Sequence, residues 1–106
     1  MNCFTRIKLA LTEDNPTIKP YFEERWAELV DSKSIPIFAS LKIIEGIHER
    51  WVHLLNSLSE EELNKTFIHP ASQQEFKIKE TIVHYAWHCN HHLAHITQLK
   101  IKNNWQ

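Results

Sequence analysis

Apolar residues recur about every 3.6 positions along most of this chain, which is the spacing of one face of an α-helix. The pattern predicts a helix that begins with the first residues and ends at the polar stretch 12–16. A short helix is expected over residues 21–30, with Pro20 near its first turn, where proline is tolerated. A longer helix is expected over residues 36–58, so the first half of the chain is predicted to be mainly helical.

The second half of the chain is predicted to hold a short and a long helix, separated by a non-helical connection. Ser59 followed by Glu62 is a capping-box pattern, which starts a short helix before Asn64. Residues 66–78 place TFIHP and EFKI around the polar ASQQ and predict a loop with a small hairpin. The clearest helix is expected over residues 79–102. The fold class predicted from these segments is all-α.

The two long predicted helices each carry one apolar stripe. In the helix of residues 36–58, the stripe consists of Ile37, Leu41, Ile44, Trp51, Val52 and Leu55. In the helix of residues 79–102, it consists of Ile82, Tyr85, Cys89, Leu93 and Ile96, with Leu99 along one edge. His48 lies in the middle of the first stripe, and His53 lies on the opposite face. An unpaired imidazole facing inward is costly, so His48 either hydrogen-bonds in the core or belongs to a polar site.

Histidines are concentrated in the last helix, where WHCNHHLAHI holds four of the chain's eight. His88 and His92 are separated by four positions, which places two imidazoles one turn apart on the same helical face. Two neutral imidazoles in this arrangement can bind one divalent ion from the same side. Zinc, nickel, copper and iron all accept imidazole, so the type of ligand does not identify the metal. Such pairs also occur without a ligand, and from this helix alone both interpretations remain open.

The neighbouring histidines and the cysteine of this helix have plainer interpretations. His84 and His91 lean toward solvent and are interpreted as surface residues. His95 forms a further pair with His91 at the same four-residue spacing. The motif is not the H-E-x-x-H of metalloproteases, because position 89 is a cysteine and no glutamate lies between the ligands. Cys89 points with the apolar stripe and is expected to be a small buried residue.

Composition narrows the class of protein further. The 106 residues are enough for one small domain covering 1–106, and the one glycine and four prolines suit a helical chain with few tight turns. A formal net charge of -1 gives no electrostatic reason to expect nucleic acid or a membrane as partner. Because the chain has no signal-peptide pattern and no apolar run of membrane length, it is expected to be cytoplasmic, with Cys3 and Cys89 reduced.

Several stretches form a recognisable set and cover essentially the whole chain, namely RIKLALTEDNPTIKPYFEERWAELVDSK, IHERWVHLLNSLSEEEL, FIHP and YAWHCNHHLAHI, followed by Trp105. Together they resemble the YfiT type of DinB-like protein. The resemblance implies a DinB-like four-helix bundle of the up-and-down type, often dimeric, that acts on a small-molecule substrate. It also implies a divalent metal ion, zinc or nickel, held by three histidines, two of which match His88 and His92. Family members are described as proposed metal-dependent hydrolases, and some as thiol S-transferases that use bacillithiol.

The chain departs from the family's pattern at its N-terminus. The family's third histidine ligand lies on its second helix, slightly upstream of the segment that matches MNCFTRIKLAL, which here starts with Met1. The first helix, most of the second helix and the third ligand are therefore expected to be missing, in agreement with a predicted helix that starts without a capping group. His48 and His95 are candidates for supporting or proton-transfer roles near the metal.

The missing ligand leaves three hypotheses for function. The protein is a metal-dependent hydrolase or thiol transferase, a non-catalytic metal-binding or ligand-binding bundle, or an incomplete fold that is stable only as an oligomer. Two histidines from one helix hold only one side of an ion, so activity is expected to be weak until a third ligand is supplied, a role for which His48 is the weaker candidate. Apolar stripes left uncovered predict a dimer or larger homo-oligomer.

Overall fold

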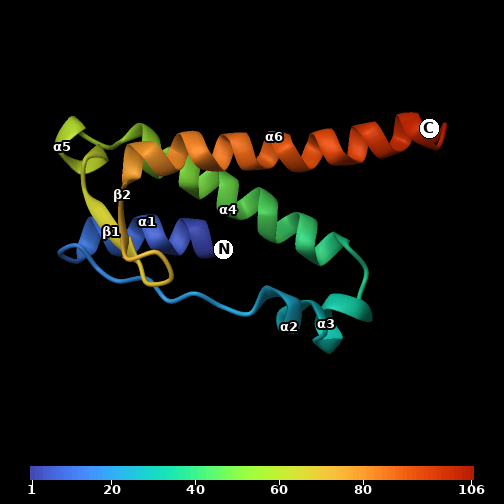
Figure 1. The fold of residues 1–106 in the computed structure, drawn as a ribbon, viewed down its shortest axis with the longest axis horizontal. Coiled ribbons are helices and arrows are strands. Elements are labelled where there is room, and N and C mark those ends of the chain that lie inside the picture. Colours follow the sequence, from blue (N-terminus) through green and yellow to red (C-terminus); the bar gives the residue numbers. More distant parts are fainter.

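The computed structural model describes all 106 residues, most of which lie in helices (Figure 1). The helices are α1 Asn2–Thr12, α2 Glu23–Ala27, α3 Val30–Lys33, α4 Phe38–Asn56, α5 Glu60–Leu63 and α6 Ile78–Lys102, and the strands are β1 Thr66–His69 and β2 Gln74–Lys77. Figure 1 shows α6 running along most of the length of the molecule, with α4 crossing it at an angle. The two helices meet at Trp51 and Tyr85, whose ring centroids are 5.7 Å apart.

The strands β1 and β2 form an antiparallel hairpin between α5 and α6. Aromatic and β-branched residues favour the strand conformation of β1, and Phe67 of β1 stacks on Phe76 of β2 with ring centroids 5.8 Å apart. In the connecting turn, Gln73 has a positive φ of 54° and donates a side-chain N–H to the Pro70 carbonyl. The small hairpin predicted within residues 66–78 is therefore confirmed, as an addition to an otherwise helical fold.

The chain that follows α1 pairs with this hairpin. Ile68 donates its N–H to the Pro16 carbonyl, and Ile18 donates its N–H to the Ile68 carbonyl. At the other end of the hairpin, Ile78 donates its N–H to the Lys65 carbonyl. These backbone hydrogen bonds between distant segments fix the end of α1 next to the start of α6.

The buried core lies at this end of the molecule. Ile7 and Ile78 are completely buried, and Ala10, Ile18 and Phe67 complete the cluster. Partly buried side chains from α1, α4, α5, α6, the hairpin and the connection between α4 and α5 surround it, namely Leu11, Trp51, Leu55, Leu58, Leu63, Phe76, Ile82 and Tyr85. The core therefore joins α1, the hairpin and the start of α6, with one end of α4 packed along its side.

The opposite end of the molecule has no such core. Of the 25 residues of α6 only Ile78 and Thr81 are buried, and α4 has no buried residue. The accessible surface is 8623 Å², whereas a compact protein of this mass exposes about 6,200 Å². The Cα radius of gyration is 16.4 Å, against about 13 Å for a compact chain of this length. The chain is therefore more open than a closed domain.

The apolar stripes behave differently at the two ends. Leu41, Ile44, Leu93 and Ile96 are each at least half exposed, as predicted for stripes that nothing covers. Trp51, Leu55 and Ile82, which belong to the same stripes, pack against the core instead. Although many apolar side chains are exposed, no helix is both long enough and apolar enough to cross a membrane.

The long helices begin and end within one or two residues of the predicted positions. The single short helix predicted over residues 21–30 is wrong, because the structure has α2 and α3 there. Leu29 separates them with an extended backbone of φ -66° and ψ 152°. The Ser32 hydroxyl donates to the Trp26 carbonyl at 3.0 Å. This hydrogen bond satisfies a carbonyl group at the end of α2, where the chain turns.

The capping box predicted for the start of α5 is confirmed. The Ser59 hydroxyl accepts the Glu62 N–H at 3.2 Å, and the Glu62 carboxylate accepts the Ser59 N–H at 2.8 Å. Hydrogen bonds from the Ser59 backbone and then its side chain stabilise the charged carboxylate, so the pKa of Glu62 lies below its usual value.

Candidate metal centre

His88 and His92 lie on consecutive turns of α6, in the part of the helix beyond the core. Their rings meet edge to face, with centroids 4.4 Å apart and planes at 85°. The two Nε2 atoms are 3.1 Å apart, so both rings direct the same nitrogen toward one point. The predicted convergence of these side chains is therefore confirmed, and both remain exposed. Their role as metal ligands stays a prediction.

The spacing of the two Nε2 atoms suits two ligands of one divalent ion. Two nitrogens 3.1 Å apart, each about 2.0–2.1 Å from an ion, subtend an angle of about 100° there. This angle lies between the values of octahedral and tetrahedral coordination, about 90° and about 109°. A neutral imidazole that donates its Nε2–H to the other ring has the same separation, and an ion would replace that proton. The pair therefore fits two positions of a metal site.

The 106 residues do not complete a site around this pair. No three side chains of histidine, cysteine, aspartate or glutamate come close enough together to hold an ion. His48, the weaker candidate for a third ligand, thus does not complete a three-residue ligand set with the pair. His53 lies on the other side of α4, in a cleft shared with Phe4 and Lys8 of α1. Any further coordination positions are left to water, a substrate or ligands from outside these residues.

The remaining histidines of α6 form a row beside the pair. His91 and His95 have ring centroids 4.3 Å apart, and the rings of His84 and His88 are 6.3 Å apart. The His95 ring also lies 6.3 Å from that of His92. All of these side chains are exposed, which agrees with the surface positions predicted for His84 and His91. His95 is therefore placed to exchange protons with water near the pair, and a role in proton transfer stays a prediction.

His48 of α4 borders a small, mainly apolar cavity between α4 and α6. The cavity has a volume of about 170 Å³, and Trp51, Tyr85 and Cys89 also line it. His48 Nδ1 lies 2.8 Å from the Ile44 carbonyl oxygen. Because a carbonyl only accepts, Nδ1 carries the proton in this contact, and Nε2 of the neutral ring keeps a lone pair. A hydrogen bond within its own helix therefore satisfies one nitrogen of His48 and leaves the other available. The expected burial of His48 in the core is wrong, because the residue is exposed.

The walls of the same cavity correct the prediction for Cys89. This residue is exposed rather than buried, and Figure 1 shows that α4 and α6 move apart toward the C-terminal end of α6. Trp51, on the facing helix, leaves its Nε1–H buried without a hydrogen-bond partner. An unsatisfied buried donor costs about 1–3 kcal/mol, so the contact between α4 and α6 is imperfect in this region.

The structure has a polar contact between α1 and α6 that the sequence pattern did not predict. Tyr85 lies beside Cys3 and Arg6 of α1. Burial, with a further contribution from Cys3, raises the pKa of the Tyr85 phenol to about 12, and Arg6 opposes this effect. The pattern places Tyr85 in an apolar stripe, and only the three-residue spacing of Cys3 and Arg6 signals that both face one partner. Tyr85 precedes His88 by one helical turn.

Comparison with known proteins agrees with this arrangement. The model of the DinB superfamily matches residues 1–96. Relatives from Bacillus cereus (strain 03BB102) and Bacillus anthracis (strain CDC 684 / NRRL 3495) are each 57% identical over 105 residues, and each is named "Putative metal-dependent hydrolase". The matches cover 99% of this chain and 60% of each relative, so the chain spans about three-fifths of the length of these proteins.

A solved structure shows the same architecture. YfiT from Bacillus subtilis superposes with a TM-score of 0.94 at 39% sequence identity, over 100% of this chain and 61% of YfiT. That protein is described as "a probable metal-dependent hydrolase with an unusual four-helix bundle topology". The four-helix bundle architecture expected from the sequence is therefore confirmed for the part of the bundle that this chain covers.

Proposed function

This chain belongs to the DinB superfamily, and on that premise we propose that it binds a divalent metal ion through His88 and His92 and takes part in metal-dependent hydrolysis. The observation that carries the proposal is the 3.1 Å separation of the two Nε2 atoms. The names of the relatives support the same class of reaction. Zinc and nickel are the proposed metals, because the family resemblance implies one of these two and both accept imidazole nitrogen.

The residues of this chain contribute orientation and proton transfer. A divalent ion at this position would supply Lewis-acid chemistry to a polar group of the substrate. α6 holds the two ligand nitrogens one turn apart on a regular helix, which limits how far they can separate. His48, with a lone pair on Nε2 beside the cavity, is the proposed general base. His95, close to His92 and exposed, is proposed to pass protons to solvent.

A third ligand is proposed to come from outside these residues. His88 and His92 fix only one side of an ion, so its other positions fill with water and its affinity falls. Metal affinity and turnover are expected to rise together in a longer chain that adds a histidine upstream of Met1. Both should fall again when that histidine becomes alanine. Equal activity in the two chains would mean that these 106 residues already hold a complete site.

We propose that this chain associates with further copies of itself to form a homo-oligomer. The exposed surface exceeds that of a compact protein of the same mass by about 2,400 Å², and many large apolar side chains are exposed. Stable protein interfaces bury about 1,200–2,000 Å² in total, and permanent dimers bury more. The excess exposed surface of the chain is therefore large enough to include such an interface, and the uncovered stripes of α4 and α6 are the faces proposed to form it with a second copy.

Calorimetric titration with zinc and with nickel tests the metal site. His88→Ala and His92→Ala should each weaken binding by more than about 100-fold, because loss of a supporting residue alone costs about 10–100-fold. His91→Ala is the matched control on the same exposed face of α6, and His53→Ala is the control on α4. Both controls should bind as the unaltered chain does. If His91→Ala weakens metal binding as much as His92→Ala does, the ion is bound by the histidine row in general and the proposed pair is wrong.

Activity assays separate the possible reactions. Hydrolysis of ester or amide substrates that depends on added metal and on His92 would support the proposed function. Transfer of a bacillithiol-type thiol without hydrolysis would mean that the reaction is thiol transfer and not hydrolysis. Metal binding without turnover, in a chain that has its third ligand, would leave a non-catalytic metal-binding bundle.

A further inference from the structure

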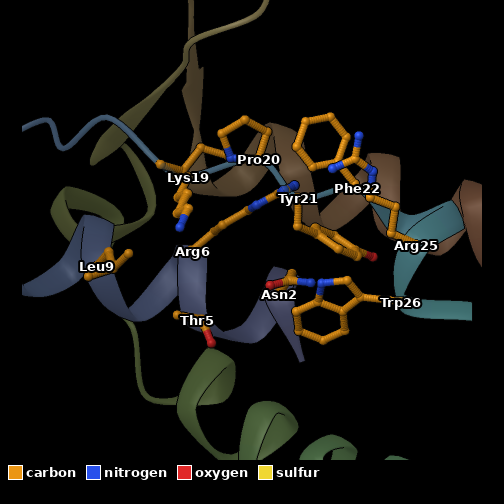
Figure 2. A pocket seen from close by; sticks show the side chains of 11 residues that line it. Asn2, Thr5, Arg6, Leu9, Lys19, Pro20, Tyr21, Phe22, Arg25 and Trp26 are labelled. Atoms are coloured by element: carbon orange, nitrogen blue, oxygen red, sulfur yellow. The ribbon is translucent and has the colours of Figure 1, made fainter. Parts of the chain in front are cut away.

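A larger cleft lies between α1 and the segment of residues 18–26, outside the histidine pair (Figure 2). Its volume is about 440 Å³, which lies within the range of about 300–1,000 Å³ typical of small-molecule sites. One wall is the face of α1 that carries Arg6, and the other is the chain around Tyr21 and Trp26. None of the residues proposed to bind or assist a metal lines this cleft.

The charge in this cleft is entirely positive. Arg6, Lys19 and Arg25 line it, and no acidic residue does, although Glu23 and Glu24 stand at the start of α2. The salt bridges of the chain lie elsewhere, so none of the three cations is paired with a carboxylate. In a chain whose formal net charge is -1, three unpaired cations around one cleft form a local field that attracts anions.

The two arginines are positioned to donate hydrogen bonds into the cleft. Arg25 lies over the Phe22 ring, with its guanidinium carbon 4.4 Å from the ring centroid. Stacking of this kind fixes the plane of the guanidinium and leaves its N–H edge free. Arg6 is half-buried, and Figure 2 shows its side chain extending from α1 across the cleft toward Tyr21 and Phe22. A half-buried guanidinium without a counter-ion gains from an anion that accepts its hydrogen bonds.

Aromatic side chains line the rest of the cleft. Tyr21 and Trp26 meet edge to face with ring centroids 5.0 Å apart, and Phe22 lies next to Tyr21. Tyr21 is 38% exposed, Trp26 is 47% exposed and Phe22 is 60% exposed, so each ring offers free apolar surface. Rings of this size gain from contact with another flat group. The cleft therefore combines anion-binding donors with a flat apolar wall.

The cleft between α1 and α4 provides a contrast within the same protein. It is larger, at about 620 Å³, and it also contains cations, Lys8 and Arg50. However, Glu49 lines it too, and its charges are therefore mixed. Volume and positive residues alone do not distinguish the two clefts. The absence of acids and the cluster of aromatic rings distinguish the one that contains Arg6.

We propose that the cleft between α1 and residues 18–26 binds a small organic anion, a carboxylate or phosphate attached to a flat apolar group. Arg6 and Arg25 bind the charged group, and Tyr21 and Trp26 contact the flat group. Arg6 also lies beside the Tyr85 hydroxyl, one helical turn before His88. A role for the cleft in recognising the charged end of a substrate rests on the proposed function, whereas anion binding itself does not.

Titration of metal-free protein in the presence of EDTA tests the cleft separately from the metal. The probes are benzoate and phenyl phosphate, measured by calorimetry and by the shift of the Trp26 indole N–H signal in NMR spectra. Arg6→Gln and Arg25→Gln should each weaken binding about tenfold or more, because each removes charge-assisted hydrogen bonds. Arg50→Gln makes the same change in the contrasting cleft and should have no effect. If Arg6→Gln, Arg25→Gln and Arg50→Gln bind the probes equally tightly, the proposal is overturned.

Neutral and purely inorganic probes test the two halves of the ligand. Benzamide has the shape of benzoate without its charge and should bind at least about tenfold more weakly. Inorganic phosphate lacks the flat group and should bind more weakly than phenyl phosphate, and Trp26→Leu should reduce that difference. Benzamide binding as tightly as benzoate, or phosphate as tightly as phenyl phosphate, would overturn the proposed ligand class. Circular dichroism confirms that each variant is folded, and unchanged zinc binding by Arg25→Gln separates this test from that of the metal site.

Discussion

The two ends of α6 have different surroundings, although the helix is continuous. At its start, Ile78 and Thr81 are buried against α1 and the hairpin. Beyond Tyr85 every residue of the helix is exposed. The packed end is held by contacts between segments that are far apart in the sequence, including the hydrogen bonds of Ile68 with the chain after α1. The open end is held mainly by hydrogen bonds within the helix.

This difference separates the residues that maintain the fold from those proposed to act on a ligand. Ile7 and Ile78 hold α1, the hairpin and α6 together in the core. His88 and His92 lie on the open part of α6, where both side chains are exposed. Substitutions at the packed end should therefore change stability strongly. Substitutions at the open end should change binding and association and leave the folding of the chain nearly unaltered.

The largest expected effect is the loss of stability when Ile78 becomes alanine. Ile78 is fully buried, and removing a buried aliphatic side chain costs about 2–5 kcal/mol of the free energy of unfolding. Ile101→Ala makes the same change on the same helix, at a residue that is 69% exposed, and should change stability by less than about 0.5 kcal/mol. Urea unfolding followed by circular dichroism measures both.

A milder substitution keeps this comparison usable in a chain with a small core. If Ile78→Ala is already unfolded without urea, Ile78→Val should remain folded and cost about 0.5–1.5 kcal/mol. Similar losses for Ile78 and Ile101 variants would contradict the difference between the ends of α6. Such a result would mean that the open end is covered by another element in solution.

Much of the helical part of this fold could be predicted from the sequence. The apolar spacing of α4 and α6 is regular, and the Ser59–Glu62 pair is a local signal whose hydrogen bonds span only three residues. The break between α2 and α3 was not predicted, because it depends on Leu29 taking an extended backbone and on Ser32 bonding back to Trp26. Neither residue type requires that conformation, so the sequence pattern carried no signal for it.

The candidate sites show the same division between local and non-local information. The convergence of His88 and His92 follows from helical geometry alone, and the structure agrees with it. Burial of Cys89 was predicted from its place in the stripe and is wrong, because burial depends on whether α4 follows α6 that far. The cleft around Arg6 and Arg25 was missed for the same reason. Its walls are α1 and residues 18–26, two separate segments that meet only through the folding of the chain after α1.

The second expected effect, smaller than that at the core, concerns self-association through the open end. Leu93 is 61% exposed on the uncovered stripe of α6, and Leu93→Glu should weaken association of the 106-residue chain by about tenfold, equivalent to ~1.4 kcal/mol. Val83→Glu is the matched control, because Val83 is 70% exposed but lies away from the stripe. Sedimentation velocity over a range of concentrations measures both. A monomer at every concentration, or equal effects of the two variants, would exclude the stripe as the interface.

The smallest expected effect is a dependence of stability on high pH at the boundary between the two ends. Burial raises the pKa of Tyr85 to about 12, whereas an unfolded tyrosine titrates near pH ~10. The folded state keeps the phenol proton between these two values while the unfolded state loses it. Stability from Tyr85 is therefore fully present below pH ~10 and falls as the pH rises toward ~12. The effect is limited, because Tyr85 is only partly buried and solvent screens its interactions.

A comparison with Tyr85→Phe isolates this contribution from the lysines and cysteines that titrate over the same range. The urea midpoint of the unaltered chain should fall more steeply between pH 9 and pH 11 than that of Tyr85→Phe, because phenylalanine has no proton to lose. Cys3→Ser should lessen the difference, since Cys3 adds to the raised pKa. If both chains lose stability equally, Tyr85 titrates as it would in water. The contact between α1 and α6 would then be open to solvent, and the packed end of the molecule would stop short of Tyr85.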